Sequence, residues 1–346
     1  ISHFGGGKAL PKDMIVPTPT GDRLWGSIEV GDQLIGCNGK PTTVLGVYDQ
    51  GIQDIYKITF DTEETIECTG DHLWEVYDHE FEEVVVLSTS QIIKNGLWKI
   101  KTTPRLFNRW SLPLISPIRY CTGLMRVPKG MEDDVDYISA EADIDDIISW
   151  IDSYENIYIP CRYMYAPILI RNNLINNLLR IRGSFVTKEQ KKLITWKNAE
   201  YVICSNNLTT AENLVQLIKS IGGLAVLLPQ TWGTKDFEKT DYMVFLTIPK
   251  AVSPHKKIKF IPVRYIKTIH KTGVKKSCMC VKVDAVDSLY LADNFIPTHN
   301  TTALCQLAAG MLNHSPGLYV TLEMPAANIL FKILASATNG VVDTNL

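Results

Sequence analysis

Thr298-His299-Asn300-Thr301 is the stretch that decides how this chain is organised. An Asn between a His and a hydroxyl residue can attack its own backbone carbonyl through the side-chain amide, close a succinimide and cut the chain behind itself. His299 can donate a proton to that cleavage, and the hydroxyl of Thr301 can accept an acyl group. Because His-Asn-Thr occurs by chance in many chains, the tripeptide alone is a weak signal for this chemistry. The two ends of the sequence make it stronger.

The two ends form the halves of one nucleotide-binding motif. Residues 1–8 read ISHFGGGK and residues 301–304 read TTAL. If residues 9–300 are removed, the ends join as SHFGGGK-TTALCQLAAG, which is the end of a Walker A loop opening a helix. Backbone amides would cradle phosphate, Lys8 would reach the terminal phosphates and Thr301 would hold magnesium. The nucleotide-binding residues expected in the joined loop are Gly5, Gly6, Gly7, Lys8, Thr301 and Thr302.

Composition indicates an ordinary globular protein. The chain has 346 residues, enough for two or three domains, and its hydrophobic content of 45% argues against disorder. Lys and Arg number 35 against 37 Asp and Glu, so the net charge of -2 does not indicate general polyanion binding. No apolar run is long enough to span a membrane, and Ile1 opens no signal peptide, so we expect a fragment of a cytoplasmic protein. The eight Cys residues lack disulfide-framework or zinc spacing, which predicts reduced thiols and no metal site.

The segment 9–118 has the pattern of an all-β unit. Short β-favouring runs alternate with turn residues, and Asn38-Gly39 is a strong hairpin signal. The expected strands include residues 42–48, 55–60, 84–87 and 98–102.

The composition changes from about residue 127, where an acidic stretch leads into an α+β pattern. Helices are expected at 144–150, 168–181 and 210–221, with strand-like ends around a Lys-rich turn between 185 and 204. Strands return at 242–246, 264–266 and 280–283, and a hairpin through Tyr290 leads to Asn300. From Thr301, a helix to about Leu312 followed by a buried strand at 317–324 is typical of an α/β fold.

Together these segments resemble an intein that interrupts a DnaB-type replicative helicase, over essentially the whole sequence. Residues 17–21 with 30–32 are similar to the first splicing block of inteins, and Thr69-Gly70-Asp71-His72 is similar to the Thr-x-x-His block. Residues 280–292 and Thr298-His299-Asn300-Thr301 are similar to the last two blocks. The four matches occur in the order that the family has, which makes the resemblance specific. It implies a mainly β, horseshoe-like Hint splicing domain.

Residue 9 decides which class of intein the chain resembles. Ordinary inteins begin with Cys or Ser, whose side chain attacks the preceding carbonyl, and Ala9 has no such nucleophile. Class 3 inteins use a Cys in the penultimate block instead, with a Trp two residues after the block His and a Thr after the terminal Asn. The matching residues here are Cys280, Trp74 and Thr301, which favours a working class 3 intein over an inactive insertion.

The resemblance implies the course of the reaction. Cys280 would attack the Lys8 carbonyl as a thiolate and release the amine of Ala9, with His72 protonating that amine and Thr69 orienting the bond. Thr301 would then take the acyl group, Asn300 would cyclise with help from His299, and an acyl shift would join Lys8 to Thr301. No cofactor is required.

Each of these residues also has a structural interpretation. Taken singly, His72 and Trp74 are more often core residues, and Cys280 is more often a buried thiol. Many inteins carry a further His in the penultimate block, and Leu289 stands at that position here.

The middle segment resembles a degenerate LAGLIDADG homing endonuclease. Residues 175–185 are similar to its helix-then-strand motif, but Arg180 and Arg182 stand where the family has acidic residues. A guanidinium does not ligate magnesium, so we expect no endonuclease activity. Weak DNA binding through the basic turn remains an alternative to a solvated turn; its residues are Lys188, Lys191 and Lys192.

The flanks resemble the helicase, whose ATPase domain is RecA-like. Thr321-Leu322-Glu323-Met324 is similar to a DnaB strand in which the Glu is the catalytic base, so Glu323 takes that role by resemblance. The spliced host would bind ATP, Mg²⁺ and single-stranded DNA and would form a homohexamer. The alternatives are an inactive insertion in the helicase and a residual DNA-binding module. The expected domains are 1–8 and 301–346 (α/β P-loop host stubs), 9–118 and 251–300 (splicing domain) and 119–250 (linker and endonuclease-like insertion).

Overall fold

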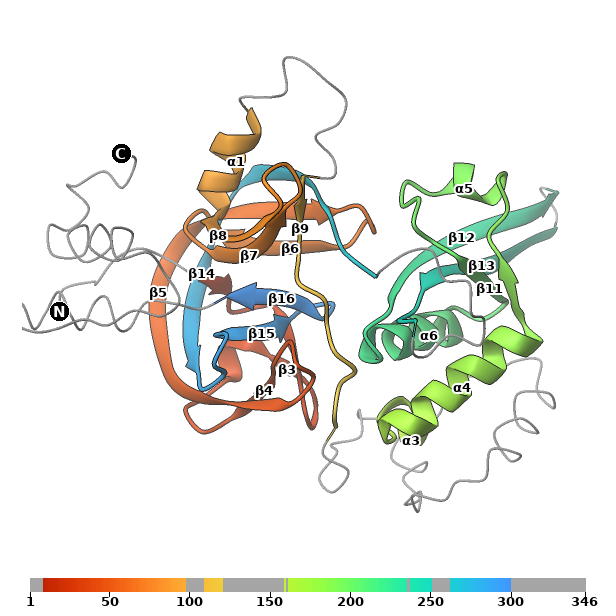
Figure 1. Cartoon of the computed structure of the whole chain (residues 1–346), viewed down its shortest axis with the longest axis horizontal. Helices are drawn as coiled ribbons and strands as arrows, with labels where there is room; N and C mark the ends of the chain where they lie inside the picture. Colours follow the sequence, from red (N-terminus) through yellow and green to blue (C-terminus); the bar gives the residue numbers. More distant parts are fainter. Residues whose placement is uncertain are drawn as a thin grey trace, which may run out of the picture.

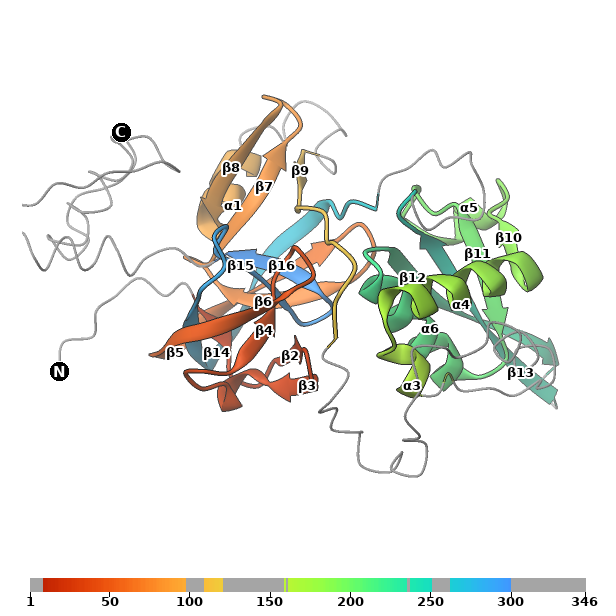
Figure 2. The same cartoon turned by 60° about the horizontal axis from the view of Figure 1, so that its bottom comes forward.

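The computed structural model describes residues 9–97, 109–120, 159, 161–234, 237–250 and 262–299. These residues form two bodies, which Figures 1 and 2 show next to each other. The β-rich unit is made from the described parts of 9–120 and 262–299, and the α+β unit from those of 159–250. None of the described helices is both long and apolar enough to cross a membrane.

The β-rich unit contains two five-stranded sheets and one small hairpin. The first sheet has the order β1-β14-β5-β4, with β6 also paired to β5; its strands are β1 Leu10–Pro11, β4 Gln33–Ile35, β5 Pro41–Phe60, β6 Thr65–Thr69 and β14 Ile266–Val283. The second has the order β15-β16-β7-β8, with β9 also paired to β7; its strands are β7 Leu73–Asp78, β8 Glu83–Ser88, β9 Trp110–Ser111, β15 Leu289–Ala292 and β16 Ile296–His299. The remaining elements are the hairpin strands β2 Ile15–Thr18 and β3 Gly21–Leu24, the 3-10 helix η1 Trp25–Ser27 and the helix α1 Thr89–Leu97.

The long antiparallel pair β5 and β14 joins the two separated stretches of the β-rich unit, and Figure 1 shows both strands curving together along one flank. In β14, Met279, Val281 and Val283 are buried and alternate with the less buried Cys280 and Lys282. This alternation turns one face of the strand to the core.

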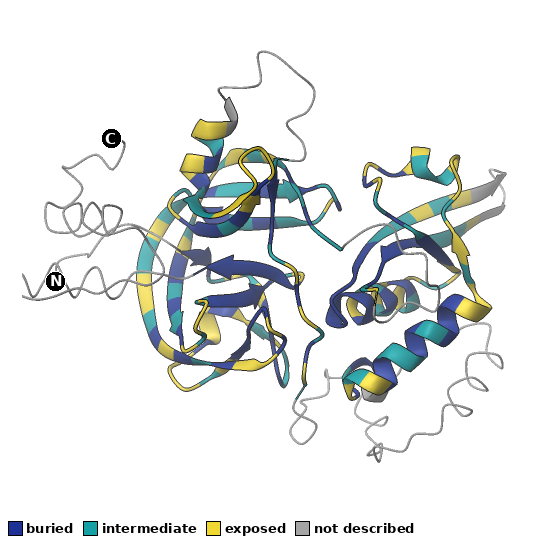
Figure 3. Ribbon diagram, viewed as in Figure 1, coloured by how far each residue is buried: buried dark blue, intermediate teal, exposed yellow. Residues whose placement is uncertain are grey.

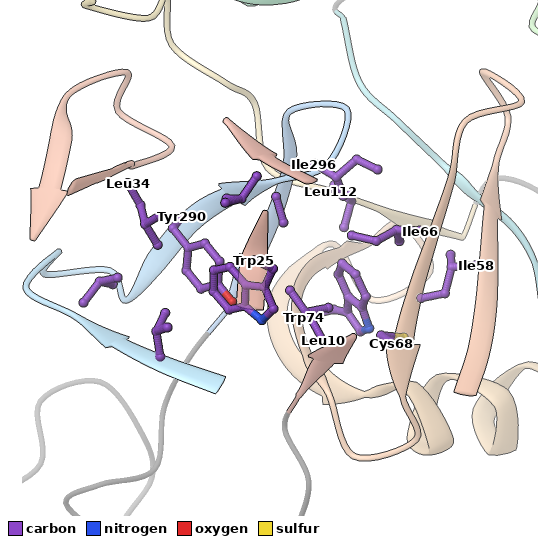
Figure 4. Close-up of a cluster of buried hydrophobic side chains, with 14 of the residues drawn as sticks. Leu10, Trp25, Leu34, Ile58, Ile66, Cys68, Trp74, Leu112, Tyr290 and Ile296 are labelled. Carbon is purple, nitrogen blue, oxygen red and sulfur yellow. The ribbon is translucent and has the colours of Figure 1, made fainter. Parts of the chain in front are cut away.

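The core of the β-rich unit is organised around two tryptophans (Figure 4). Trp25 stacks on Tyr290 with ring centroids 5.5 Å apart, and its indole N–H donates to the Met279 carbonyl over 3.2 Å. Trp74 is fully buried. Strands β15 and β16 are buried along their whole length, as the dark blue colour in Figure 3 shows. The end of the β-rich unit that precedes Asn300 is therefore an internal hairpin.

The α+β unit is a four-stranded antiparallel sheet of order β10-β11-β13-β12 with helices packed on one face. Its elements are α3 Cys161–Met164, α4 Ile168–Ile181, β10 Gly183–Phe185, α5 Gln190–Leu193, β11 Tyr201–Ser205, α6 Leu208–Ser220, β12 Leu224–Thr234 and β13 Phe237–Thr247. The chain turns directly from α4 into β10 at Gly183, where a Cβ would lie 2.6 Å from the Leu179 carbonyl oxygen. Only glycine fits this turn.

Most of the expected elements are present. The helix predicted at 168–181 has these bounds, the helix predicted at 210–221 is α6, and Asn38-Gly39 forms the turn between β4 and β5 with Gly39 at φ 73°. The α+β pattern of the middle segment is confirmed.

Two expectations about secondary structure were wrong. The first stretch is not all β, because α1 begins at Thr89 directly after β8, a short helix that the surrounding strand pattern conceals. Strand β12 was missed because its second half is polar and Pro229 interrupts it, whereas its pairing with β13 along its full length supplies the backbone hydrogen bonds. The expected helix at 144–150, the strand at 98–102 and both P-loop flanks lie outside the described residues.

Candidate active site

One threonine holds the backbone of Ala9 from both sides. The Ala9 N–H donates to Thr69 Oγ1 over 3.1 Å, and the Thr69 N–H donates to the Ala9 carbonyl, also over 3.1 Å. The exposed fractions of Ala9 and Thr69 are 0% and 3%. The nitrogen of the peptide bond that follows Lys8 is therefore buried, fixed and in contact with a hydroxyl group.

The pairing of β1 with β14 places Cys280 opposite Ala9. Leu10 pairs with Met279 and Pro11 with Cys278, in antiparallel order. Continuing this register by one residue places Ala9 opposite Cys280. Because side chains two residues apart share one face of a strand, Cys280 is on the face of β14 where Cys278 packs against Ala9.

A β-bulge brings one further side chain to the Cys280 sulfur. The register of β5 on β14 shifts by one residue between Asp49 and Gly51, which leaves Gln50 as the extra residue. Gln50 Nε2 donates to Cys280 Sγ over 3.6 Å. The bulge is stabilised because Asp49 Oδ1 accepts from the Gly51 N–H over 3.0 Å and glycine tolerates the φ of 63° at position 51. An amide N–H in this position stabilises negative charge on sulfur.

The neighbouring thiols are unsuited to nucleophilic attack. Burial raises the pKa of Cys278 to about 11 and that of Cys68 to about 12, and the side chain of Cys278 donates to the Lys276 carbonyl over 3.3 Å. Both are therefore neutral thiols near pH 7, whereas the thiolate is the reactive form. Cys280, by contrast, is only half-buried.

His72 and Trp74 form a packed pair that α1 holds in place. The two rings meet edge to face, with centroids 4.7 Å apart, and both side chains are buried. Trp74 Nε1 donates to Thr89 Oγ1 over 3.0 Å, and the Thr89 N–H donates to the His72 carbonyl over 2.9 Å. His72 is connected to Thr69 as well, because its own N–H donates to the Thr69 carbonyl over 3.2 Å. The predicted His and Trp are thus brought together beside the threonine that holds Ala9.

His299 reaches the same sheet from the other end of the chain. It pairs with Leu289 in β15 and with Leu73 in β7, so it lies next to the strand that carries Trp74 and that His72 directly precedes. Its exposed fraction is 7%. Leu289 is buried directly opposite His299, so a leucine side chain occupies the position where the resemblance led us to look for a second imidazole.

The structure therefore brings together Ala9 and five further predicted site residues: Thr69, His72, Trp74, Cys280 and His299. Lys8, Asn300 and Thr301 lie outside the described residues, as do Gly5, Gly6, Gly7, Thr302 and Glu323.

The described part of the α+β unit lacks a comparable set of groups. Arg180 and Arg182 are exposed at the end of α4. Among the residues that the structure describes, no group of three His, Cys, Asp or Glu side chains could hold a metal ion.

Sequence reasoning missed two residues of the site. Gln50 was not singled out, although an Asp and a Gly that flank one residue inside a long strand pattern are typical of a bulge. Thr89 was not singled out, because nothing local indicates that its hydroxyl accepts from a tryptophan 15 residues earlier.

Comparison with known proteins finds two kinds of similar protein, and no protein-family model matches the chain. Among curated proteins, the replicative DNA helicase DnaB of Mycobacterium intracellulare is 38% identical over 71 residues, which is 20% of this chain and 12% of the helicase. The chain thus matches about an eighth of the length of this relative.

Several solved structures of inteins are similar to the chain. The MchDnaB-1 intein (N145AA) aligns with 85% of this chain and all of its own, at 14% identity and a TM-score of 0.32. The splicing domain of the Msm DnaB1 intein, bound with zinc, aligns with 84% of this chain and all of its own, at 14% identity and a TM-score of 0.31. The gp41-1 intein is 29% identical over 25% of this chain and 62% of its own, with a TM-score of 0.21.

Proposed function

We propose that the chain is a protein-splicing precursor that excises residues 9–300 and joins Lys8 to Thr301 by a peptide bond. The observation that carries the proposal is the convergence on Ala9. Its amide nitrogen contacts Thr69 Oγ1, the β1–β14 register brings Cys280 level with it, and His299 lies in the neighbouring sheet. No other described region combines a half-buried thiol, a buried histidine and a fixed backbone amide.

The first step follows from the absence of a nucleophile on Ala9. The Cys280 thiolate attacks the carbonyl carbon of Lys8, the bond from that carbon to the Ala9 nitrogen breaks, and a thioester forms. The leaving nitrogen takes a proton, for which His72 is the donor, and Thr69 Oγ1 orients the amide. Gln50 stabilises the sulfur while it carries negative charge, as its 3.6 Å contact allows. Trp74 holds the His72 ring through the edge-to-face contact.

The later steps move the acyl group to the other junction. The Thr301 hydroxyl attacks the thioester, which regenerates the Cys280 thiol and leaves residues 1–8 attached through an ester. Asn300 then attacks its own carbonyl, assisted by His299, so that the bond to Thr301 breaks and a succinimide forms. The freed amine of Thr301 attacks the ester carbonyl and completes the peptide bond. Bonds are exchanged at each step, so neither ATP nor a metal is needed.

We further propose that the joined product is part of a DnaB-type helicase and that splicing restores its phosphate-binding loop. In the precursor, Lys8 and Thr301 are separated by 292 residues of sequence, from 9 to 300, whereas a Walker A loop needs them adjacent. Thr301 would serve first as acyl acceptor and afterwards as magnesium ligand. We do not extend the proposal to DNA cleavage, because α4 ends in exposed guanidinium groups rather than carboxylates.

The test follows the mass of the full chain over time, in the parent and in Cys280→Ala, with Cys278→Ser as the matched thiol control. We expect the parent to release residues 9–300 together with the joined product, Cys278→Ser to do the same, and Cys280→Ala to produce no joined product. A parent that stays intact, or a Cys280→Ala variant that splices like the parent, would rule out the proposed reaction.

A further inference from the structure

Three charged side chains meet in a buried cluster between the two units. Glu64 lies between β5 and β6, Lys219 is in the last turn of α6, and Arg264 precedes β14. Glu64 Oε1 is 2.5 Å from Lys219 Nζ, and Glu64 Oε2 is 2.6 Å from Arg264 Nε. The exposed fractions of the three side chains are 7%, 5% and 3%. These residues are called the ionic clamp below.

Both cations of the ionic clamp also hold the turn between β15 and β16. Lys219 Nζ donates to Asn294 Oδ1 over 3.1 Å. The Arg264 guanidinium donates to the carbonyls of Asn294 over 3.0 Å and of Phe295 over 3.3 Å. Because β16 runs only from Ile296 to His299, this turn lies one short strand before the terminal His-Asn pair.

The turn has a backbone conformation that needs such support. Asp293 has a φ of 38° and Phe295 a φ of 54°, which is the left-handed region that residues with a Cβ avoid. Neither residue is a glycine that would adopt this conformation readily. The hydrogen bonds from Lys219 and Arg264 are therefore suited to hold the hairpin in one geometry.

The charges of the ionic clamp depend on one another. Burial raises the pKa of Glu64, but Arg264 and Lys219 outweigh that effect and bring the pKa down to about 2. The carboxylate therefore stays ionised at neutral pH. Because an uncompensated buried charge is unfavourable, loss of one member disturbs the contacts of the other two.

A second set of contacts ties the same end of α6 to the same hairpin. The Ile118 N–H donates to the Ser220 carbonyl over 2.8 Å, and Arg171 in α4 donates to the carbonyls of both residues. Ile118 in turn packs with Leu289 and Leu291 of β15. The α+β unit thus contacts the hairpin directly through Lys219 and indirectly through Ile118, which Ser220 and Arg171 hold against the apolar side of the hairpin.

We infer that Lys219, through the ionic clamp, is a positioning residue for the cleavage at Asn300, so that the α+β unit takes part in the second half of the reaction. The inference rests on the proposed function. The first half is held independently, because Thr69 fixes Ala9 and Trp25 fixes Met279 within the β-rich unit. Loss of Lys219 should therefore slow the cleavage after Asn300 without slowing the cleavage after Lys8.

The test compares full-length Lys219→Met and Lys219→Arg with Lys267→Met, which removes a surface cation bound to Glu63 and serves as the matched control. Transfer of the Lys8 acyl group leaves the mass of the chain unchanged, so cleavage after Lys8 is timed as the fraction of chains from which hydroxylamine releases residues 1–8. Release of the segment after Asn300 is timed directly by mass. We expect Lys219→Met to slow the second event by about tenfold while the first stays within about twofold, with branched ester accumulating. Lys219→Arg should recover part of the rate, and Lys267→Met should match the parent.

A second variant covers the case in which Lys219→Met does not fold. Asn294→Ala removes the side-chain acceptor at the exposed turn and leaves the Glu64–Lys219 pair intact, so we expect it to fold and to slow the second event about threefold. Equal slowing of both events, or unchanged release in Asn294→Ala and Lys219→Met, would overturn the positioning role. If the parent itself forms neither branched ester nor excised fragment, the proposed splicing function fails instead.

Discussion

The β-rich unit is assembled from the described residues of two separated stretches of the chain, 9–120 and 262–299, whereas the described residues of the α+β unit come from one stretch, 159–250. In the β-rich unit, the pairing of β5 with β14 brings residues from both stretches to one place, so that Thr69, His72 and Cys280 gather around Ala9. In the α+β unit, β10 to β13 pair among themselves and the basic side chains at the end of α4 point to solvent.

This difference indicates that the β-rich unit carries the candidate reacting residues and that the α+β unit supports them. In the proposed reaction the reacting groups come from both ends of residues 9–300, and the pairing of β5 with β14 brings these two stretches together. The α+β unit contacts that assembly through the end of α6. We therefore expect substitutions in the β-rich site to stop or slow the chemistry, and substitutions on the exposed face of the α+β unit to leave it unchanged.

The largest effect among the contacts of the β-rich site is expected for Thr69→Val. The substitution removes the hydroxyl that contacts the Ala9 amide but keeps the shape of the side chain. Because a buried N–H loses its acceptor and the scissile amide loses its orientation, cleavage after Lys8 should slow by roughly tenfold to a hundredfold. The fraction of chains from which hydroxylamine releases residues 1–8, followed over time, would test this, with Thr69→Ser, which keeps the hydroxyl, expected to remain close to the parent.

An intermediate effect is expected for Gln50→Leu. Loss of the donor to Cys280 Sγ should lower the rate of thioester formation near pH 7 by about three- to tenfold, because less negative charge is stabilised on the sulfur. The fraction of chains from which hydroxylamine releases residues 1–8, followed over time, measures this rate, and a Gln50→Leu variant that reacts as fast as the parent would mean that Gln50 does not act on the sulfur.

The smallest effect is expected for the double variant Arg180→Ala and Arg182→Ala in the α+β unit. Both side chains are exposed at the C-terminal end of α4, whereas the contact of α4 with the end of α6 is made by Arg171 near its start. Splicing rate and thermal stability should stay within about twofold and about 0.5 kcal/mol of the parent. A large loss of splicing in this variant would show that the α+β unit contributes more than the contacts of α6.

Several turns and helices could be predicted from the sequence, because they depend on the conformational preferences and the apolar spacing of neighbouring residues. Asn38-Gly39 specifies its turn through backbone conformation, and the apolar spacing of 168–181 specifies α4. The splicing-block residues could be singled out because their types and order resemble the motifs of a known family. The roles of Gln50 and Thr89 could not be predicted. The Gln50 bulge depends on the pairing of β5 with β14, and the Thr89 hydroxyl accepts from Trp74 only once α1 is packed beside β7.

The ionic clamp shows why the remaining contacts escaped prediction. Glu64, Lys219 and Arg264 are separated by long stretches of sequence, and each has an ordinary surface interpretation in its own segment. A buried charge becomes stable only through partners that the tertiary fold supplies. Pattern analysis within a local window has no access to such partners.

The most direct test of the central claim is to find the acyl group on Cys280. In the full chain carrying Asn300→Ala and Thr301→Ala, the later steps are blocked and the thioester should persist. Proteolysis and mass spectrometry are then expected to find the segment ending at Lys8 attached to the peptide that contains Cys280, through a bond that hydroxylamine cleaves. An intact Lys8–Ala9 bond in every molecule, or the segment attached to Cys278 instead, would contradict the account.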